Sequence, residues 1–120
     1  KGIPILVLDD VLDAVILIKR ILQKKGHVIF TFTEEEDALD YARSNKVDLA
    51  ILDIKLKKMS GVEVLEELKK IEPAIRAIIL TGYPTMETAR ESLKHGANEY
   101  CVKPIDKDEL EEKVAGVLEG

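Results

Sequence analysis

Five side chains that could do chemistry stand where apolar stretches of this chain end. Asp9 and Asp10 follow IPILVL, Asp53 follows LAIL, Thr81 ends RAIILT and Lys103 follows EYCV. If these stretches are parallel strands, their carboxyl ends lie at one edge of a sheet, where ligands bind. Three carboxylates that meet there must hold protons or a cation. Their oxygens suit Mg²⁺, and an aspartate beside that ion can attack a phosphoryl donor and form an acyl phosphate. The spacing therefore predicts a phosphoryl-transfer site.

Taken singly, each of these residues has an ordinary structural explanation. Acids after strands are commonly turn or cap residues, Thr81 could be a strand-end hydroxyl, and Lys103 could be a solvated surface charge. Independent turn residues need not supply acids, a hydroxyl and an ammonium on strands that converge. Their agreement at one edge favours the functional interpretation.

The elements that must position these residues alternate along the chain. Strands are predicted at residues 3–8, 28–33, 48–53, 76–81 and 99–102. Helices are predicted at residues 12–25, 34–44, 60–71, 85–95 and 106–118. Alternating strands and helices predict a doubly wound α/β fold of three layers, with a parallel sheet covered on both faces. The first, third and fourth strands are the most apolar, so we place them centrally.

With the mixed second and fifth strands at the edges, right-handed crossovers favour the strand order 2-1-3-4-5. The choice among compatible orders also draws on flavodoxin-like folds, which have this order. Capping boxes are predicted at the pairs Thr33–Glu36 and Ser60–Glu63, and Asp106 is predicted to cap the last helix. The inner face of the first helix is predicted from its apolar residues, Leu12, Val15, Ile16 and Leu22.

Composition narrows the class of protein. The 120 residues suffice for one domain, residues 1–120, although a chain that starts at Lys1 could be a fragment of a longer protein. A net charge of -5 argues against nucleic-acid binding by this domain. No apolar run approaches the roughly 20 residues of a membrane span. The single cysteine, Cys101, fits a reducing compartment, so we expect a cytoplasmic protein without membrane contact.

Motifs over nearly the whole chain, Ile3 to Leu118, resemble the receiver domain of bacterial and archaeal two-component response regulators. They are VLDD (7–10), LAILDIKL (49–56), MSG (59–61), ILTG (79–82) and EYCVKP (99–104). The resemblance implies a phosphorylation-dependent signalling switch rather than an enzyme with a separate substrate. It implies that a sensor histidine kinase or a phosphotransfer protein supplies the phosphoryl group. It also implies an output domain or effector, which the sequence does not identify, and allows a homodimer through residues 85–118.

The resemblance also assigns roles. Asp53 is implied as the phosphoacceptor. Mg²⁺ would be held by Asp10, Asp53 and the backbone carbonyl of Lys55, with Asp9 assisting largely through water. Lys103 would pair with the phosphoryl group.

Activation in this family implies a movement. Thr81 would shift to bind the phosphoryl group, and the switch aromatic, Tyr100, would turn inward. The resulting change would repack the face formed by residues 85–118. The peptide bond before Pro104 would be cis.

Two features are particular to this chain. Lys57 stands where the family commonly has a proline, which puts the stiffness of that loop in question. Lys55 and Tyr83 occupy the positions two residues beyond the acceptor and the switch threonine, and neither readily orients water. We therefore expect slow self-dephosphorylation.

Three other classes remain as alternatives. An aspartate-nucleophile phosphatase of the haloacid dehalogenase type needs a second Asp where this chain has Lys55. A flavodoxin-like cofactor binder needs a phosphate cradle and paired aromatics that the loops lack. A receiver-like interaction module without phosphorylation is disfavoured by the complete set of Asp10, Asp53, Thr81 and Lys103.

Overall fold

Strands and helices alternate strictly along the computed structural model, which describes residues 2–120. The strands are β1 (Pro4–Leu8), β2 (Val28–Phe32), β3 (Leu49–Leu52), β4 (Arg76–Thr81) and β5 (Glu99–Val102). The helices are α1 (Leu12–Gln23), α2 (Glu35–Ser44), α3 (Gly61–Ile71), α4 (Met86–Lys94) and α5 (Lys107–Glu119). Every predicted element is confirmed, with ends that differ from the prediction by at most two residues.

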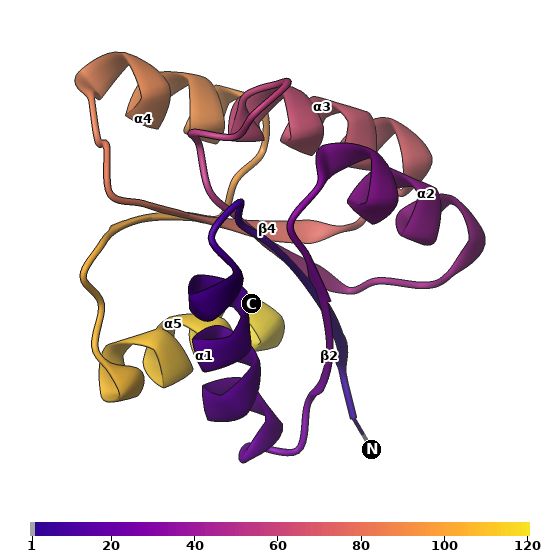
Figure 1. Ribbon diagram of the computed structural model, residues 1–120, viewed down its shortest axis with the longest axis vertical. Coiled ribbons are helices and arrows are strands. Elements are labelled where there is room, and N and C mark those ends of the chain that lie inside the picture. Colours follow the sequence, from indigo (N-terminus) through magenta and orange to yellow (C-terminus); the bar gives the residue numbers. More distant parts are fainter. Residues whose placement is uncertain (1) are drawn as a thin grey trace.

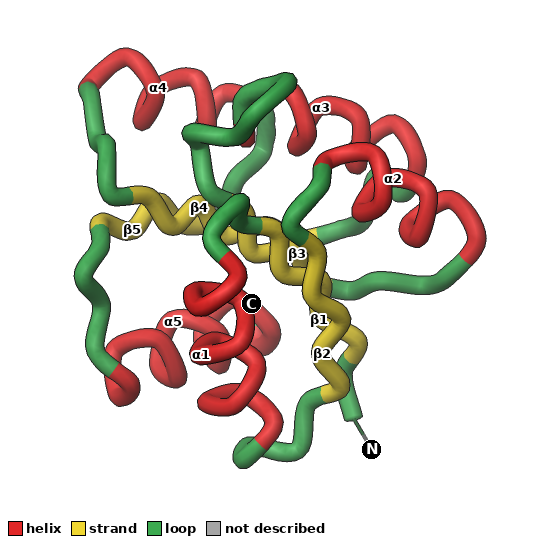
Figure 2. The backbone as a smooth tube through the Cα atoms, in the orientation of Figure 1, coloured by secondary structure: helices red, strands yellow, loops and turns green. Residues whose placement is uncertain are grey.

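The five strands form one parallel sheet in the order β2-β1-β3-β4-β5, as predicted, and Figure 2 shows them in a row. Leu8, the last residue of β1, is in register with Leu52, the last residue of β3. β1 and β3 therefore end side by side, although their following helices leave toward opposite faces. The residues directly after these two strands share one crevice for that reason.

Helices cover both faces of the sheet: α2, α3 and α4 lie on one side, and α1 and α5 on the other (Figure 1). Each side has its own apolar core. Leu6 and Leu8 point into the core beneath α2 and α3, whereas Ile5 and Val7 point into the core beneath α1 and α5. Successive side chains of each strand therefore pack into two separate cores, one on each face of the sheet. These cores fix the strand ends that carry the polar residues.

The predicted inner face of α1 is partly wrong. Val15 and Leu22 are buried as expected, and Ile18 is buried with them. Leu12 and Ile16, however, are 60% and 41% exposed. The helix carries more apolar residues than the stripe facing the sheet can accommodate, so some must face water.

One of the predicted capping boxes is also wrong. Ser60 and Glu63 form the expected reciprocal bonds at the start of α3. At α2, however, Glu34 rather than Thr33 occupies the N-cap position and makes no side-chain cap bond. The helix starts one residue later than the Thr33–Glu36 spacing requires, so the two side chains do not face each other across its first turn.

Candidate functional site

Three carboxylates meet where β1 and β3 end. Asp9 and Asp10 directly follow β1, and Asp53 directly follows β3 with its N–H donating to the Leu8 carbonyl at 3.1 Å. Asp9 and Asp53 are 2% and 6% exposed, and Asp10 is half-buried. Each offers a carboxylate oxygen, and the three oxygens lie within 4.8 Å of one another. The structure thus brings the three predicted acids into one cluster.

Lys103 reaches this cluster from the loop after β5. Its Nζ donates to Asp9 Oδ2 at 2.5 Å and lies 3.4 Å from Asp53 Oδ2. Burial alone would lower the pKa of Lys103, but the two carboxylates raise it above its usual value. The lysine is therefore held as an ammonium between two acids. The peptide bond between Lys103 and Pro104 is cis, as expected.

The charges of the cluster do not balance. Among residues 2–120, Lys103 is the one cation within ion-pair distance of any of the three acids, and it pairs with Asp9 and Asp53. One ammonium against three carboxylates leaves an excess of negative charge in a largely buried place. Oxygen ligands with excess negative charge suit a hard divalent cation such as Mg²⁺. The donor set therefore fits the predicted metal.

Lys55 lies at the rim of the cluster. Its N–H is 3.4 Å from Asp53 Oδ1, so the loop backbone turns back toward the acid. Its side chain is exposed, and Nζ lies 4.4 Å from the centre of the Tyr83 ring, at cation–π distance. Lys55 and Tyr83, which we predicted separately to influence phosphate loss, thus contact each other.

The side chains of the two predicted switch residues, Thr81 and Tyr100, hydrogen-bond to groups other than the three carboxylates. Thr81 ends β4 fully buried, and its Oγ1 accepts from the Tyr83 N–H at 3.1 Å. Tyr100 is on β5, packs against the core beneath α3, and its hydroxyl lies 2.7 Å from Thr88 Oγ1. Thr88 also forms the capping box that starts α4, so Tyr100 is tied to that helix.

Gly61, the first residue of α3, packs directly against the backbone of Asp53. Its N–H donates to the Ile54 carbonyl at 2.8 Å. A Cβ at this position would lie 2.0 Å from the Asp53 carbonyl oxygen. The glycine is therefore required for the loop to close onto the strand end that carries the acid.

Sequence reasoning missed a contact between α2 and the loop after β3. The Glu35 carboxylate is buried and accepts hydrogen bonds from the N–H groups of Lys58 and Met59 at 2.5 and 3.0 Å. These partners are 23 and 24 residues away, so no local pattern shows the contact. An acidic run such as Glu34–Asp37 indicates only a favourable helix start.

Within residues 2–120, none of the helices has the length and apolar character needed to cross a membrane.

A family model described as the response regulator receiver domain matches residues 5–115. Sporulation initiation phosphotransferase F of Bacillus subtilis strain 168 is 36% identical over 114 residues, covering 95% of this chain and 92% of that protein. The transcriptional regulatory protein ZraR of Escherichia coli K12 is 36% identical over 110 residues, covering 92% of this chain. The chain spans only 25% of the length of ZraR.

A solved structure has the same fold. The crystal structure of a CheY-like response regulator receiver domain protein from Methanospirillum hungatei JF-1 superimposes with a TM-score of 0.96 at 32% identity. The superposition covers 99% of this chain and 95% of the other. The acidic cluster between β1 and β3, the flavodoxin-like strand order and the family match over residues 5–115 agree, and the chain accordingly belongs to the response regulator receiver domain family of phosphorylation-dependent two-component signalling.

Proposed function

We propose that Asp53 is the phosphoacceptor of this chain and that residues 1–120 act as a single receiver domain. The observation that carries the proposal is the cluster of Asp9, Asp10 and Asp53 with the ammonium of Lys103 between two of them. In this arrangement Asp53 would be a nucleophilic carboxylate beside oxygens that can hold a metal and beside a fixed positive charge. These are the parts that phosphoryl transfer requires.

In the proposed reaction, an oxygen of the Asp53 carboxylate attacks the phosphorus of a phosphohistidine on a partner protein. The P–N bond breaks, its electron pair stays with the imidazole, and an acyl phosphate forms on Asp53. Asp10, Asp53 and the carbonyl of Lys55 would hold Mg²⁺, with Asp9 assisting through water. The bound ion would offset negative charge on the phosphoryl oxygens.

Lys103 would contribute the second positive charge. Its Nζ bonds Asp9 and lies 3.4 Å from Asp53, so a short movement would bring it to a phosphoryl oxygen. The change exchanges one charge-assisted bond for another. The chain thus assists its own phosphorylation with a residue that already stands beside the acceptor.

The switch would start at Thr81. Its hydroxyl oxygen accepts from the Tyr83 N–H, and its own proton would be donated to a phosphoryl oxygen as the side chain moves toward the acceptor. Space vacated beside β4 would let the Tyr100 ring turn inward, which breaks its bond to Thr88 at the start of α4. A partner that binds the repacked face of residues 85–118 more tightly then shifts the population toward it.

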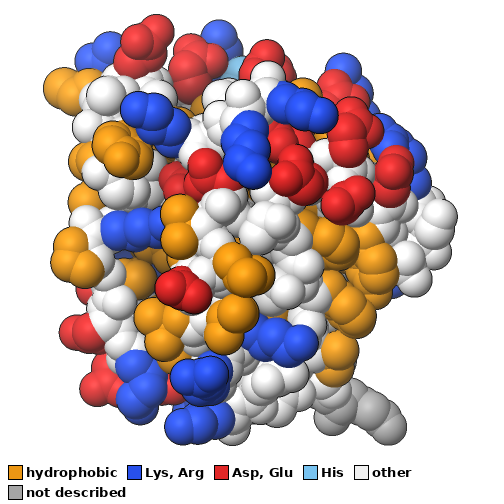
Figure 3. Space-filling view, viewed as in Figure 1, with side chains coloured by type: hydrophobic (Ala, Val, Ile, Leu, Met, Phe, Trp, Pro, Cys, Tyr) orange, Lys and Arg blue, Asp and Glu red, His pale blue; other side chains and the backbone are white. Residues whose placement is uncertain are grey.

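The surface around the site supports a protein as the phosphodonor. Val11, Leu12 and Leu17 on and before α1 are exposed, and Figure 3 shows apolar side chains gathered over α1. A hollow lined by Leu17, Lys103 and Pro104, with four further residues of α1, β4 and the loop after β5, opens beside them. A sensor kinase or phosphotransfer protein that packs there would bring its phosphohistidine toward Asp53.

Output would pass through the face formed by α4, β5 and α5. Met86 and Leu93 on α4 and Val102 on β5 are exposed, which suits a homodimer or an effector on the face of residues 85–118. ZraR, which is described as a transcriptional regulator, extends well beyond the part that this chain matches. We propose that this chain likewise controls an output partner.

Incubation with Mg²⁺ and acetyl phosphate, followed by intact-mass measurement, tests the acceptor. The wild type should gain the mass of one phosphoryl group, and D53N should gain none. An adduct that survives D53N would refute the assignment of Asp53. No adduct on the wild type would instead favour an interaction module that does not take phosphate.

A further inference from the structure

Glu35 is a buried carboxylate outside the acidic cluster. It is the first residue of α2 and is 2% exposed, yet its side chain reaches away from its own helix. Its Oε2 accepts from the backbone N–H groups of both Lys58 and Met59. Burial alone would raise the pKa of Glu35, but these two bonds, together with its own backbone N–H and the charge of Lys58, lower the pKa overall. The side chain is therefore a charged anchor for another segment.

The anchored segment is the loop of the candidate site. Residues 53–60 connect β3 to α3, begin with the proposed acceptor and include Lys55. Backbone hydrogen bonds hold the two ends of this loop, from the Asp53 N–H to Leu8 and from the Gly61 N–H to Ile54. Between those ends, the Glu35 carboxylate accepts the hydrogen bonds of the Lys58 and Met59 N–H groups. The loop has no proline to restrict its backbone.

The neighbouring Glu34 offers an internal comparison. Its carboxylate forms an ion pair with Lys57 at 3.3 Å, on the same loop but with both side chains largely exposed. Exposed ion pairs contribute little because water and salt screen them. Buried hydrogen bonds from backbone N–H groups to a carboxylate are stronger, and losing the acceptor leaves two amides unpaired. Of the two glutamates, Glu35 is the one that can fix the loop.

We propose that Glu35 is a positioning residue for the metal and phosphoryl site. By holding Lys58 and Met59, it keeps the loop in the conformation that holds the Lys55 backbone beside Asp53, with its N–H 3.4 Å from Asp53 Oδ1, before any ligand arrives. Mg²⁺ then binds without first ordering the loop, because the ordering is already complete in the free protein. This inference rests on the proposed function, since it concerns the same site.

The first test uses the metal-free protein. Amide hydrogen exchange at Lys58 and Met59 should be about tenfold or more faster in E35A, which is the effect of losing hydrogen bonds to a charged group. E35Q keeps an acceptor oxygen, so it should fall between E35A and the wild type. E34Q is the matched control and should exchange like the wild type. Unchanged exchange in both Glu35 variants would overturn the anchor.

The second test measures Mg²⁺ binding through the rise in melting temperature over a titration. Half-saturation in E35Q should need about tenfold more Mg²⁺, the lower end of the effect of residues that orient a metal ligand. Phosphorylation of E35Q by acetyl phosphate should recover at saturating Mg²⁺, which a damaged fold would not do. E34Q should titrate like the wild type.

The outcomes separate the two proposals. A wild type that binds Mg²⁺ and takes phosphate, with Glu35 variants that titrate within twofold of it, overturns the positioning role and leaves the proposed function intact. A wild type that does neither defeats the proposed function itself. If circular dichroism shows that E35A does not fold, the results for E35Q alone test the positioning role of Glu35.

Discussion

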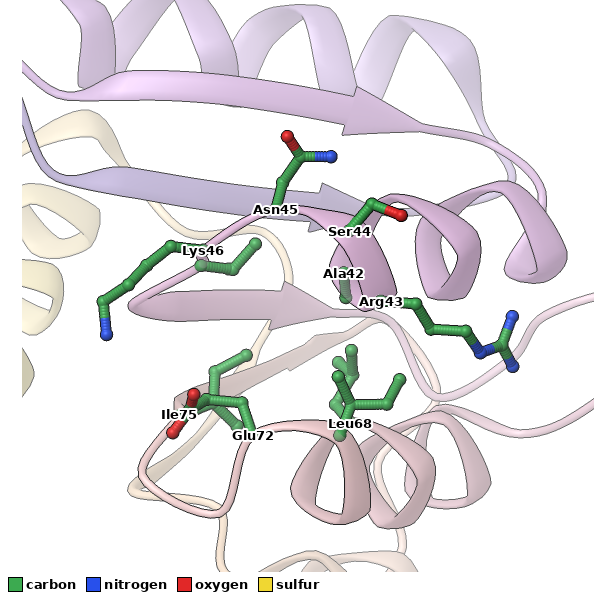
Figure 4. Close-up of a pocket in the computed structure, with 10 residues that line it drawn as sticks. Ala42, Arg43, Ser44, Asn45, Lys46, Leu68, Glu72 and Ile75 are labelled. Carbon is green, nitrogen blue, oxygen red and sulfur yellow. The ribbon is translucent and has the colours of Figure 1, made fainter.

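The carboxyl and amino edges of the sheet differ in whether their charged side chains are buried. At the carboxyl edge, Asp9 and Asp53 are buried and share Lys103. At the amino edge, a cavity of about 310 Å³ lies between the ends of α2 and α3, where Figure 4 shows Arg43 and Glu72 among its lining residues. Arg43 is exposed there and pairs with Asp40 in its own helix. Hollows of about 430 and 420 Å³ also lie at the carboxyl edge, so volume does not distinguish the two edges. The charges at the amino edge are ordinary surface charges.

The difference follows from the winding of the chain. After β1 and β3 the chain leaves for opposite faces, so the carboxyl ends of these neighbours meet where the strand order reverses. At the amino edge, segments such as residues 45–48 and 72–75 only return the chain to the next strand. Buried charge, rather than the volume of a hollow, therefore marks the site. The predictions below set changes at the two edges against each other.

The largest expected effect is on the rate of phosphorylation. K103M removes the ammonium between Asp9 and Asp53, so phosphoryl transfer from acetyl phosphate should slow about 10²-fold, as when one charge-stabilising donor is lost. K46M at the amino edge removes an exposed lysine whose pair with Asp48 is 3.7 Å long. Its rate, followed by intact mass over time, should match the wild type. Equal phosphorylation rates in K103M and K46M would contradict the idea that buried charge distinguishes the carboxyl edge from the amino edge.

The next effect is on stability. G61A forces a methyl group against the Asp53 carbonyl and should cost about 1–3 kcal/mol of the free energy of unfolding. Gly116 lies in the last turns of α5, near the amino edge, with open space around its Cα. G116A should stabilise the protein by about 0.5–1 kcal/mol, because alanine favours a helix. Urea unfolding measures both, and a loss in G116A as large as that in G61A would contradict this account.

A smaller effect concerns pH. The pKa of Glu35 lies below its ordinary value of 4.5, so the carboxylate stabilises the fold above that value. This stabilisation is lost as pH falls below 4.5 through the lowered pKa of the folded state. Urea unfolding at decreasing pH should therefore show a shallower loss of stability in E35Q than in the wild type. E34Q loses a carboxylate that is largely exposed in the wild type, so its slope should match the wild type. An equally shallow slope in E34Q would remove the distinction.

The smallest effect should appear in the lifetime of the phosphoryl group. The Lys55 ammonium lies over the Tyr83 ring, and neither group readily orients water. We expect slow loss of phosphate in the wild type. K55N places an amide there that can hold a water molecule, so loss should quicken severalfold, as followed by the decay of the phosphorylated mass. Rapid loss in the wild type that neither K55N nor Y83A alters would count against this role.

The sheet and the acidic cluster were predictable because they rest on local patterns. The runs before Asp9, Asp53 and Thr81 are apolar and end abruptly, and strand character alone indicated which strands are central. Once the order of the strands is given, Asp9 and Asp53 must meet. Lys103 was expected at the same edge, and the structure adds that its Nζ lies 2.5 Å from Asp9 Oδ2.

Most of the failures of prediction arise from packing between segments that are far apart in the chain. The Thr33–Glu36 spacing matched a capping box, but the helix starts one residue later. Leu12 and Ile16 fit a helical stripe as well as Ile18 does, and only the sheet decides which of them is covered. The bond of Glu35 to Lys58 spans 23 residues and requires the fold to be known.

The two separate cores have a consequence for how such a chain can change over generations. Leu65 lies in the core beneath α2 and α3, Val114 in the core beneath α1 and α5, and the backbone of the sheet stands between them. Substitutions that share no partner act nearly independently. A lineage can therefore remodel the interior on one side of the sheet without waiting for a compensating change on the other, while the shared edge at Asp53 stays in place.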